Sequence, residues 1–190
     1  MKKIDPLIYI RQNALDKDFC KHCIEKFKTD EDRYDGQIGT GRVDKNIKQS
    51  TDLCISDNPK WEYEDTTFFK SLNLHFDNYQ EWVPKPYHGS ITNGGSHDTG
   101  YQLQETKPGG FYIWHHDQMF ARRVTFLWYL NDIKEDGYTE FTNGLKVQPK
   151  AGTILLFPAL WPWVHRGFPP KSEYKYICTG WIYDDPPPEN

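Results

Sequence analysis

In the first third of the chain, hydrophobic residues recur at three- to five-residue steps, which is the spacing of one face of a helix. The first such pattern predicts an amphipathic helix over 16–28, with Asp16 placed to cap its start. The second predicts a helix over 63–82 with one broad apolar face. Between them, residues 48–55 are expected to form a short strand. The two patterns are carried by Leu15, Phe19, Cys23, Ile24 and Phe27, and by Phe68, Phe69, Leu72, Phe76 and Tyr79.

From about residue 100 onward, the pattern changes to that of strands. Short runs rich in Val, Ile, Tyr, Phe, Trp and Thr alternate with turns of Gly, Pro, Asn and Asp. Seven strands at this spacing favour a sandwich or barrel over alternating strands and helices. The strands are expected at 101–106, 111–117, 124–131, 138–142, 145–149, 152–158 and 174–183.

A length of 190 residues argues for a single domain over 1–190. Residues 1–83 are expected to form a helical support, and residues 101–184 the β core. The segment 84–100 is rich in Gly, Pro and polar residues, so it is predicted to be a mobile loop that can cover a site. The Pro-rich tail, 185–190, is predicted to be flexible.

The charge balance excludes a strong attraction to polyanions. The chain has 23 Lys and Arg against 27 Asp and Glu, a net charge of −4, so no overall positive field exists to recruit nucleic acid or anionic lipid. The sequence has no run of eighteen apolar residues, and its first residues lack the pattern of a secretion signal. It therefore predicts no membrane association and a cytoplasmic location.

The four cysteines are too few for a disulfide scaffold, which fits a reducing compartment. Cys20 and Cys23 form a Cys-x-x-Cys pair, but they lie in the predicted helix over 16–28. A structural zinc site or a redox pair would need another setting. Buried free thiols are therefore expected at these two positions.

The predicted strand over 111–117 contains a candidate metal site. His115 and Asp117 are two residues apart, and such residues project to the same side of a strand. His165, just after the strand over 152–158, can supply a third ligand. Two His and one carboxylate form a facial triad that holds non-haem Fe(II) and leaves open positions. Zinc hydrolases use the same ligand types, and an exposed His beside a turn-forming Asp has the same spacing, so these residues alone leave the chemistry open.

A second His-x-Asp, His75 and Asp77, lies in the predicted helix over 63–82. Residues two apart on a helix point about 200° apart, because a helix has 3.6 residues per turn. This pair is therefore not expected to chelate one ion.

Further along, Lys175 lies in YKYICTGWIY, where a buried lysine is costly unless its charge has a partner; a bound dicarboxylate would supply one. The order RVTFLWYLN, DGYTEF, LKVQPKAGTILLFP, VHRG and YKYICTGWIY resembles the prolyl 4-hydroxylase-like branch of the Fe(II)/2-oxoglutarate oxygenases. The resemblance covers roughly residues 100–184. It implies a mainly β fold, a double-stranded β-helix (jelly roll) with N-terminal helices packed on its major sheet.

The resemblance also implies roles for individual residues. It makes His115, Asp117 and His165 the Fe(II) ligands, and Lys175 the partner of the far carboxylate of 2-oxoglutarate. The family commonly places a Tyr before the metal strand to contact this co-substrate, but here the stretch reads ETKPGGFY, with Pro near the expected position. The candidates for that contact are Tyr101 and Tyr112.

An oxygen-reacting site needs a dry, shaped cavity, which aromatic rings can supply. Most of the rings near the predicted metal strand and its neighbours are expected to be core, and Trp181 is expected to pack. Trp161 and Trp163 lie beside the third candidate ligand amid prolines, and Arg122 lies on the rim after the metal strand, so these three are candidate substrate contacts. The rings considered are Trp114, Phe126, Trp128, Trp161 and Trp163.

The activity implied by the resemblance consumes 2-oxoglutarate and O₂, releases succinate and CO₂, and hydroxylates an unactivated C–H bond, with ascorbate as the reductant. The favoured substrate is a prolyl residue in a peptide or protein, as for a procollagen-proline 4-dioxygenase. A nucleic-acid or small-molecule oxygenase is an alternative, but such branches usually bind the co-substrate with Arg, and no Arg follows Arg166. A non-enzymatic metal-binding jelly-roll module and a zinc hydrolase are further alternatives. Regiochemistry, physiological substrate and oligomeric state stay open.

Overall fold

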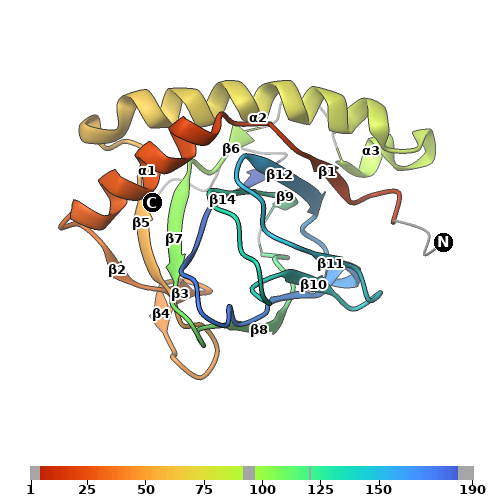
Figure 1. Ribbon diagram of the computed structural model, residues 1–190. Helices are drawn as coiled ribbons and strands as arrows, with labels where there is room; N and C mark the ends of the chain where they lie inside the picture. Colours follow the sequence, from red (N-terminus) through yellow and green to blue (C-terminus); the bar gives the residue numbers. More distant parts are fainter. Residues whose placement is uncertain (1–4, 92–96, 120, 184–190) are drawn as a thin grey trace.

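The computed structural model describes residues 5–91, 97–119 and 121–183 (Figure 1). The helices are α1 (Lys17–Thr29), α2 (Glu62–Trp82) and α3 (His88–Ile91), with 3-10 turns η1 (Pro59–Trp61), η2 (Lys85–Tyr87) and η3 (Trp161–Trp163). The strands are β1 (Tyr9–Arg11), β2 (Tyr34–Asp35), β3 (Gln37–Ile38), β4 (Arg42–Val43), β5 (Thr51–Cys54), β6 (His97–Asp98), β7 (Gln102–Thr106), β8 (Tyr112–His115), β9 (Arg122–Tyr129), β10 (Thr139–Phe141), β11 (Lys146–Val147), β12 (Thr153–Pro158), β13 (His165–Gly167) and β14 (Lys175–Tyr183).

The strands form two main antiparallel sheets and a small hairpin. The larger sheet has the order β1-β12-β9-β14-β7-β5-β2, with β6 paired to β14. The smaller sheet has the order β11-β10-β13-β8, and β3 pairs with β4. Sequence neighbours are often not sheet neighbours, since β9 lies between β12 and β14. The fold is therefore mainly β and antiparallel, as the sequence predicts.

Helix α1 begins where the sequence places its cap. Asp16 Oδ1 accepts hydrogen bonds from the backbone N–H groups of Asp18, at 2.8 Å, and Phe19, at 3.3 Å, which satisfies two of the free donors of the first turn. The helices expected over 16–28 and 63–82 are confirmed as α1 and α2. Strand β1 was not anticipated, because three residues at the edge of a sheet are too short to show a period.

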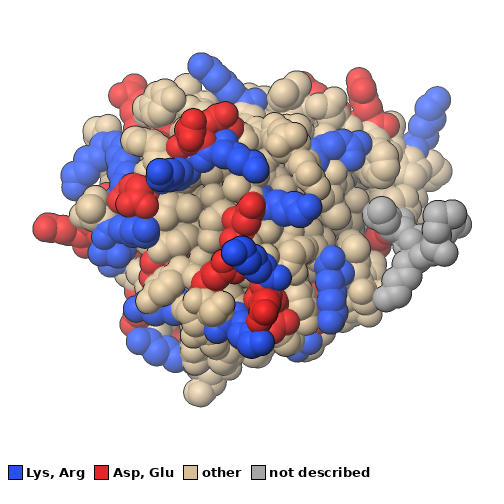
Figure 2. All heavy atoms as spheres, in the orientation of Figure 1, with Lys and Arg blue, Asp and Glu red and all other residues tan. Residues whose placement is uncertain are grey.

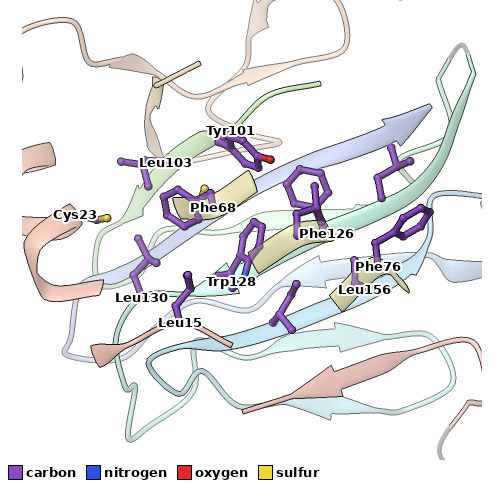
Figure 3. Close-up of a cluster of buried hydrophobic side chains, with 14 of the residues drawn as sticks. Leu15, Cys23, Phe68, Phe76, Tyr101, Leu103, Phe126, Trp128, Leu130 and Leu156 are labelled. Carbon is purple, nitrogen blue, oxygen red and sulfur yellow. The ribbon is translucent and has the colours of Figure 1, made fainter. Parts of the chain in front are cut away.

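Alternate residues of the larger sheet face two different environments. One face packs against α1 and α2, and Figure 3 shows the side chains gathered there. Phe68 of α2 is fully buried, with its ring centroid 5.2 Å from that of Trp128 and 5.7 Å from that of Tyr101. The other face looks toward the smaller sheet, where a second cluster joins Leu127 and Leu155 to Phe141. The space between the two sheets is thus available for a site.

Parts of the segment 84–100 have regular structure. Turn η2 and helix α3 occupy 85–91, and β6 pairs with β14 through Asp98 opposite Ile182. The expectation that 84–100 forms no regular element is wrong for these residues. Pro84 sits just before η2, where its fixed φ suits a helical start, and His88 Nε2 lies 2.7 Å from the carbonyl oxygen of Val83. The mobility of the loop stays a prediction, and the tail 185–190 lies outside the described residues.

Acidic and basic side chains are interspersed on the face shown in Figure 2, with no large area of one sign. Among the described residues, none of the helices is both long and apolar enough to span a membrane.

Candidate metal centre and adjoining cavity

Three potential metal ligands converge between the two sheets. His115, Asp117 and His165 each offer a ligand atom, and these atoms lie within 4.8 Å of one another. The Nε2 atom of His115 is 3.7 Å from Asp117 Oδ1, and that of His165 is 3.7 Å from Asp117 Oδ2. It is the only such group found in the described part of the chain. His75 and Asp77 do not join it; they lie on α2, where His75 Nδ1 is 3.2 Å from the hydroxyl of Tyr9.

Strand pairing and a β-bulge bring these residues together. His165 of β13 lies directly opposite His115 of β8, and Gly167 lies opposite Tyr112. Between these two pairs, β8 has two residues, Ile113 and Trp114, whereas β13 has only Arg166. Because of this extra residue, Tyr112 and His115 are on the same side of the strand and stack, with ring centroids 3.5 Å apart. A regular strand would send residues three apart to opposite faces.

Each imidazole is oriented by a hydrogen bond from its other nitrogen. His115 Nδ1 is 2.8 Å from the carbonyl oxygen of Ile113, and His165 Nδ1 is 3.0 Å from that of Trp163. With Nδ1–H donating to a carbonyl, Nε2 carries the free lone pair and can bind a metal. Both Nε2 atoms point toward Asp117. The ligand atoms are therefore held in position by the backbone.

The protonation states of the site suit a divalent cation. Burial and the neighbouring His165 lower the pKa of His115, which keeps this imidazole neutral. Burial raises the pKa of Asp117, but the two imidazoles and a hydrogen bond from Thr125 outweigh it, so the net pKa is below the usual value. The Thr125 hydroxyl donates to Asp117 Oδ2 at 2.7 Å. An ionised carboxylate and a neutral imidazole nitrogen are typical ligands of a divalent metal ion.

A cavity of about 470 Å³ adjoins the three residues, a size within the usual range of ligand pockets, about 300–1,000 Å³. Lys175 of β14 lines it and is only 6% exposed. Burial lowers the pKa of Lys175 to about 8. Among the described residues, no carboxylate forms an ion pair with its Nζ, which lies 5.7 Å from the centre of the Tyr129 ring. The cavity thus contains a lysine whose charge has no carboxylate partner in the described chain.

Of the two tyrosines considered as contacts of the co-substrate, the structure places only Tyr112 in the cavity. Tyr112 lines the cavity, and burial raises its pKa to about 12, so its hydroxyl keeps its proton. Tyr101 lies on the opposite face of the larger sheet, where it packs against Phe68. The candidate role of Tyr101 is therefore wrong. Its neighbours Gln102 and Gln104, one residue out of phase, line the cavity instead.

Of the three candidate substrate contacts, only Arg122 lies at the cavity. Arg122 lines the cavity, with its guanidinium carbon 3.5 Å from the centre of the Trp181 ring. Trp161 and Trp163 do not line it. Trp161 is 67% exposed, and Trp163 Nε1 donates to Asp5 Oδ2 at 3.2 Å. Neither residue is part of the cavity wall, although turn η3, which carries both, lies just before His165 in the chain.

Some of the large aromatic side chains lie where the sequence predicts, and others do not. Phe126 and Trp128 belong to the core beneath the helices, as expected for packing residues. Trp114 lies on the outside of the bulge, 41% exposed, under the guanidinium of Arg166. Trp181 packs against the guanidinium of Arg122 and also lines the cavity, which the expected packing role did not include. The inward phase of β14, which begins at Lys175, places Trp181 there, and this alternation is the signal that would have found it.

The cysteines show no metal-binding or redox geometry. Cys20 and Cys23 are buried free thiols, as predicted, and burial raises the pKa of Cys20 to about 12. Thiols with raised pKa values are poor nucleophiles and poor metal ligands.

Comparison with known proteins agrees with this geometry. The family model of the 2OG-Fe(II) oxygenase superfamily matches residues 101–183. A protein of Acanthamoeba polyphaga mimivirus that bears the provisional name prolyl 4-hydroxylase is 30% identical over 165 residues, which are 78% of this chain and 63% of that relative. The chain thus spans less than two thirds of the length of this relative. Residues 101–183 thus match the 2OG-Fe(II) oxygenase superfamily, and the predicted resemblance to its prolyl 4-hydroxylase-like members is confirmed.

Solved structures of prolyl hydroxylases share the fold. The viral collagen prolyl hydroxylase of Paramecium Bursaria Chlorella virus-1, in complex with 2OG, has a TM-score of 0.69 at 21% identity, covering 93% of this chain and 95% of that one. A Trichoplax adhaerens prolyl hydroxylase, in complex with a hypoxia inducible factor peptide fragment, has a TM-score of 0.76 at 19% identity, covering 94% and 84%. A Pseudomonas putida prolyl-4-hydroxylase has a TM-score of 0.69 at 16% identity, covering 93% and 92%. The fold is therefore of the jelly-roll type found in these enzymes.

Proposed function

We propose that the chain is an Fe(II)- and 2-oxoglutarate-dependent dioxygenase that hydroxylates a prolyl residue in a peptide or protein. The observation that carries the proposal is the presence of two different recognition elements in one cavity. A cluster of two imidazoles and one carboxylate lies on its wall. Lys175, which has no carboxylate partner within the described residues, lies on another strand of the same cavity. A metal site alone would not need a buried lysine, whose charge is costly without an anion.

The donor set fits ferrous iron. His115, Asp117 and His165 would hold the metal, since two neutral imidazoles and one ionised carboxylate are the ligands of non-haem Fe(II) oxygenases. When bound, the iron would supply the oxidation chemistry that consumes 2-oxoglutarate and O₂ and hydroxylates the substrate. Lys175 would hold the far carboxylate of 2-oxoglutarate by charge. Tyr112, with its protonated hydroxyl in the cavity, is the proposed second contact of the co-substrate.

Several finer features belong to the same proposal. The two sheets would form the double-stranded β-helix, with α1 and α2 as the support of its larger sheet, which is consistent with the packing of Phe68 on Trp128. Residues 1–190 would act as one domain, and ascorbate would serve as reductant. Four free cysteines are consistent with a reducing, cytoplasmic location.

The observations disfavour the alternative functions. A zinc hydrolase would use the ligand cluster, but its reaction does not require an anion that could compensate the buried charge of Lys175. A metal-binding module without activity would not need a cavity beside the ligands. An oxygenase acting on nucleic acid would be expected to have a basic surface, whereas the net charge is −4 and charges of both signs mix on the face in Figure 2.

A peptide-library screen tests the proposal. The protein is incubated with Fe(II), 2-oxoglutarate and ascorbate, and products are analysed by mass spectrometry for the gain of one oxygen atom. We expect the gain on prolyl residues, together with succinate. Succinate formation with no modified peptide would reject the peptide substrate but keep the reaction class. No metal-dependent consumption of 2-oxoglutarate would reject the whole proposal.

The hydroxyl of Thr125 is expected to position the proposed carboxylate ligand. Thr125 is 3% exposed, and its hydrogen bond to Asp117 Oδ2 fixes the rotation of that carboxylate. Thr125→Val keeps the shape of the side chain but removes the donor, so Fe(II) affinity is expected to fall about 10-fold, the usual scale for partners of metal ligands. Metal titration under anaerobic conditions measures it.

Two variants control for structural effects of the Thr125 substitution. Thr125→Ser should restore most of the affinity, because it restores the donor. Thr179→Val removes a hydroxyl from the same cavity that donates to the carbonyl of Phe126, and it should leave metal affinity unchanged. Equal metal affinity in Thr125→Val and the unaltered protein would contradict the positioning role.

A further inference from the structure

One wall of the cavity is built from uncharged hydrogen-bonding side chains of the larger sheet. Gln102, Gln104 and Thr106 line it from β7, and Thr179 lines it from the neighbouring strand β14. These residues alternate with the core residues Tyr101 and Leu103 on the other face of the same sheet. The wall therefore consists of the inward-facing residues of regular strands, and it is polar because the residues at those positions are polar.

Two amides of this wall form a directional hydrogen-bonded ladder. The Nε2 atom of Gln104 donates to Oε1 of Gln102 at 2.6 Å, and Nε2 of Gln102 donates to the hydroxyl of Tyr34 at 2.8 Å. Tyr34 on β2 thus anchors the ladder at one end. At the other end, Oε1 of Gln104 accepts no hydrogen bond from the described residues. Hydrogen bonds in a chain polarise one another, which makes the oxygen at the open end a better acceptor.

Two of the charged residues near this wall already have partners, and a third, Lys175 opposite Thr106, is the one assigned to 2-oxoglutarate. Lys48 lines the cavity, but its Nζ lies 2.6 Å from Asp52 Oδ2, and Asp52 Oδ1 accepts from Ser50 at 2.7 Å. Arg122 lies over the Trp181 ring and donates to the hydroxyl of Tyr183. With Lys175 occupied by the co-substrate, a ligand that contacts the ladder itself meets neutral amide and hydroxyl groups. The backbone of a peptide has this chemistry, and a phosphate does not.

The distance between the wall and the metal ligands suits an extended peptide. Gln102 pairs with Thr179, which pairs with Leu127 on β9, so the ladder lies two strands from the strand that carries Thr125. Two strand spacings amount to about 10 Å, which an extended chain covers in about three residues at roughly 3.3 Å each. A peptide with its target residue at the metal would therefore reach the ladder a few residues away.

We propose that Gln104, supported by Gln102 and Tyr34, accepts a hydrogen bond from a backbone N–H of the substrate peptide a few residues from the target position. The inference rests on the proposed function, and it attributes part of the selectivity for peptide substrates to this hydrogen bond. It predicts a preference for peptides that have a secondary amide at the position of the ladder. A run of consecutive prolines has no backbone N–H to donate.

The test compares two fluorescently labelled peptides, five Ala-Pro repeats and decaproline, by anisotropy with the Mn(II)- and 2-oxoglutarate-loaded protein. Gln104→Met removes the acceptor at nearly constant volume. We expect it to weaken binding of the Ala-Pro peptide about 3- to 10-fold, the equivalent of one hydrogen bond, and to leave any binding of decaproline unchanged. Tyr34→Phe, which removes only the anchor, should cause a smaller loss. Gln80→Met, the same substitution on α2, is the matched control.

Equal weakening of both peptides by Gln104→Met would show a merely structural role and overturn the proposal. Unchanged affinity for the Ala-Pro peptide would also overturn it, as would failure of the unaltered protein to bind that peptide. If only the Ala-Pro peptide binds, and Gln104→Met weakens it, the proposal stands. Succinate formation from Fe(II) and 2-oxoglutarate alone is measured in parallel on the unaltered protein. If succinate forms but no peptide binds, this inference fails while the oxygenase chemistry stands.

Discussion

Replacing Asp117 with alanine is expected to abolish Fe(II) binding and 2-oxoglutarate consumption. Asp117 supplies the only carboxylate of the ligand cluster, and two imidazoles alone would hold a divalent ion weakly. Metal content after anaerobic dialysis and succinate formation measure the loss. Asp117→Asn should be nearly as inactive, although its side-chain oxygen can still accept the hydrogen bond from Thr125. The second variant therefore separates loss of the charge from loss of local packing.

The second His-x-Asp of the chain offers a matched control for Asp117. Asp77 lies exposed on α2, away from the cluster, so Asp77→Ala should leave metal binding and succinate formation unchanged. Full metal loading of a folded Asp117→Ala protein would contradict the ligand assignment.

Lys175→Ala is expected to weaken 2-oxoglutarate binding strongly while metal binding persists. The lysine is buried beside the metal cluster without a carboxylate partner in the described chain, so its charge is available to an anion. Losing a charged hydrogen bond costs about 1.5–3 kcal/mol, which corresponds to about 10- to 150-fold in affinity. Calorimetric titration of the Mn(II)-loaded protein measures it. Lys171→Ala, an exposed lysine paired with Glu135, is the control.

The depressed pKa of Lys175 adds a pH dependence to this prediction. Burial lowers this pKa from 10.5 to about 8, so the ammonium form is lost in the free protein as the pH rises above about 8. The affinity for 2-oxoglutarate should be constant below that pH and decline above it, toward about tenfold per unit. Lys175→Arg keeps its charge and should show no such decline. A flat profile in the unaltered protein would contradict the role of the lysine.

The same pKa change affects stability with a definite sign. Between about pH 8 and 10.5 the unfolded chain holds a proton on Lys175 that the folded protein has released, so stability from this group rises with pH over that window. At neutral pH, burial of the charge costs stability. The protein thus carries a destabilised residue at the position where an anion is proposed to bind.

The helices and most of the strands follow from the sequence because their patterns are local. The period of apolar residues predicts α1 and α2, and Asp16 marks the start of the first. Two members of the metal cluster could also be predicted, because His115 and Asp117 are two residues apart in the strand expected over 111–117, although β8 ends at His115. The third, His165, lies on another strand; its place after the strand over 152–158 made it a candidate, and the family resemblance implied its role as an Fe(II) ligand.

Features that depend on strand phase or on distant pairing could not be predicted. Around β7, one face carries Tyr101 and Glu105 and the other carries Gln102 and Gln104. Because both faces contain polar residues, the sequence offered no basis for deciding which face lines the cavity. Trp161 and Trp163 lie beside His165 in the chain, but neither lines the cavity. Thr125 contacts Asp117, eight positions away in the sequence, a relation that becomes visible only in the structure.

The alternation of strand β9 separates two requirements of the molecule. Its Phe126 and Trp128 hold the sheet to the helices, whereas Thr125 and Leu127, on the other side, face the ligand space. Residues that maintain folding and residues that choose a ligand are thus adjacent in the chain but independent in their surroundings. Over evolutionary time, such a scaffold can acquire new substrate preferences through single substitutions at inward positions, with little loss of the stability on which its survival depends.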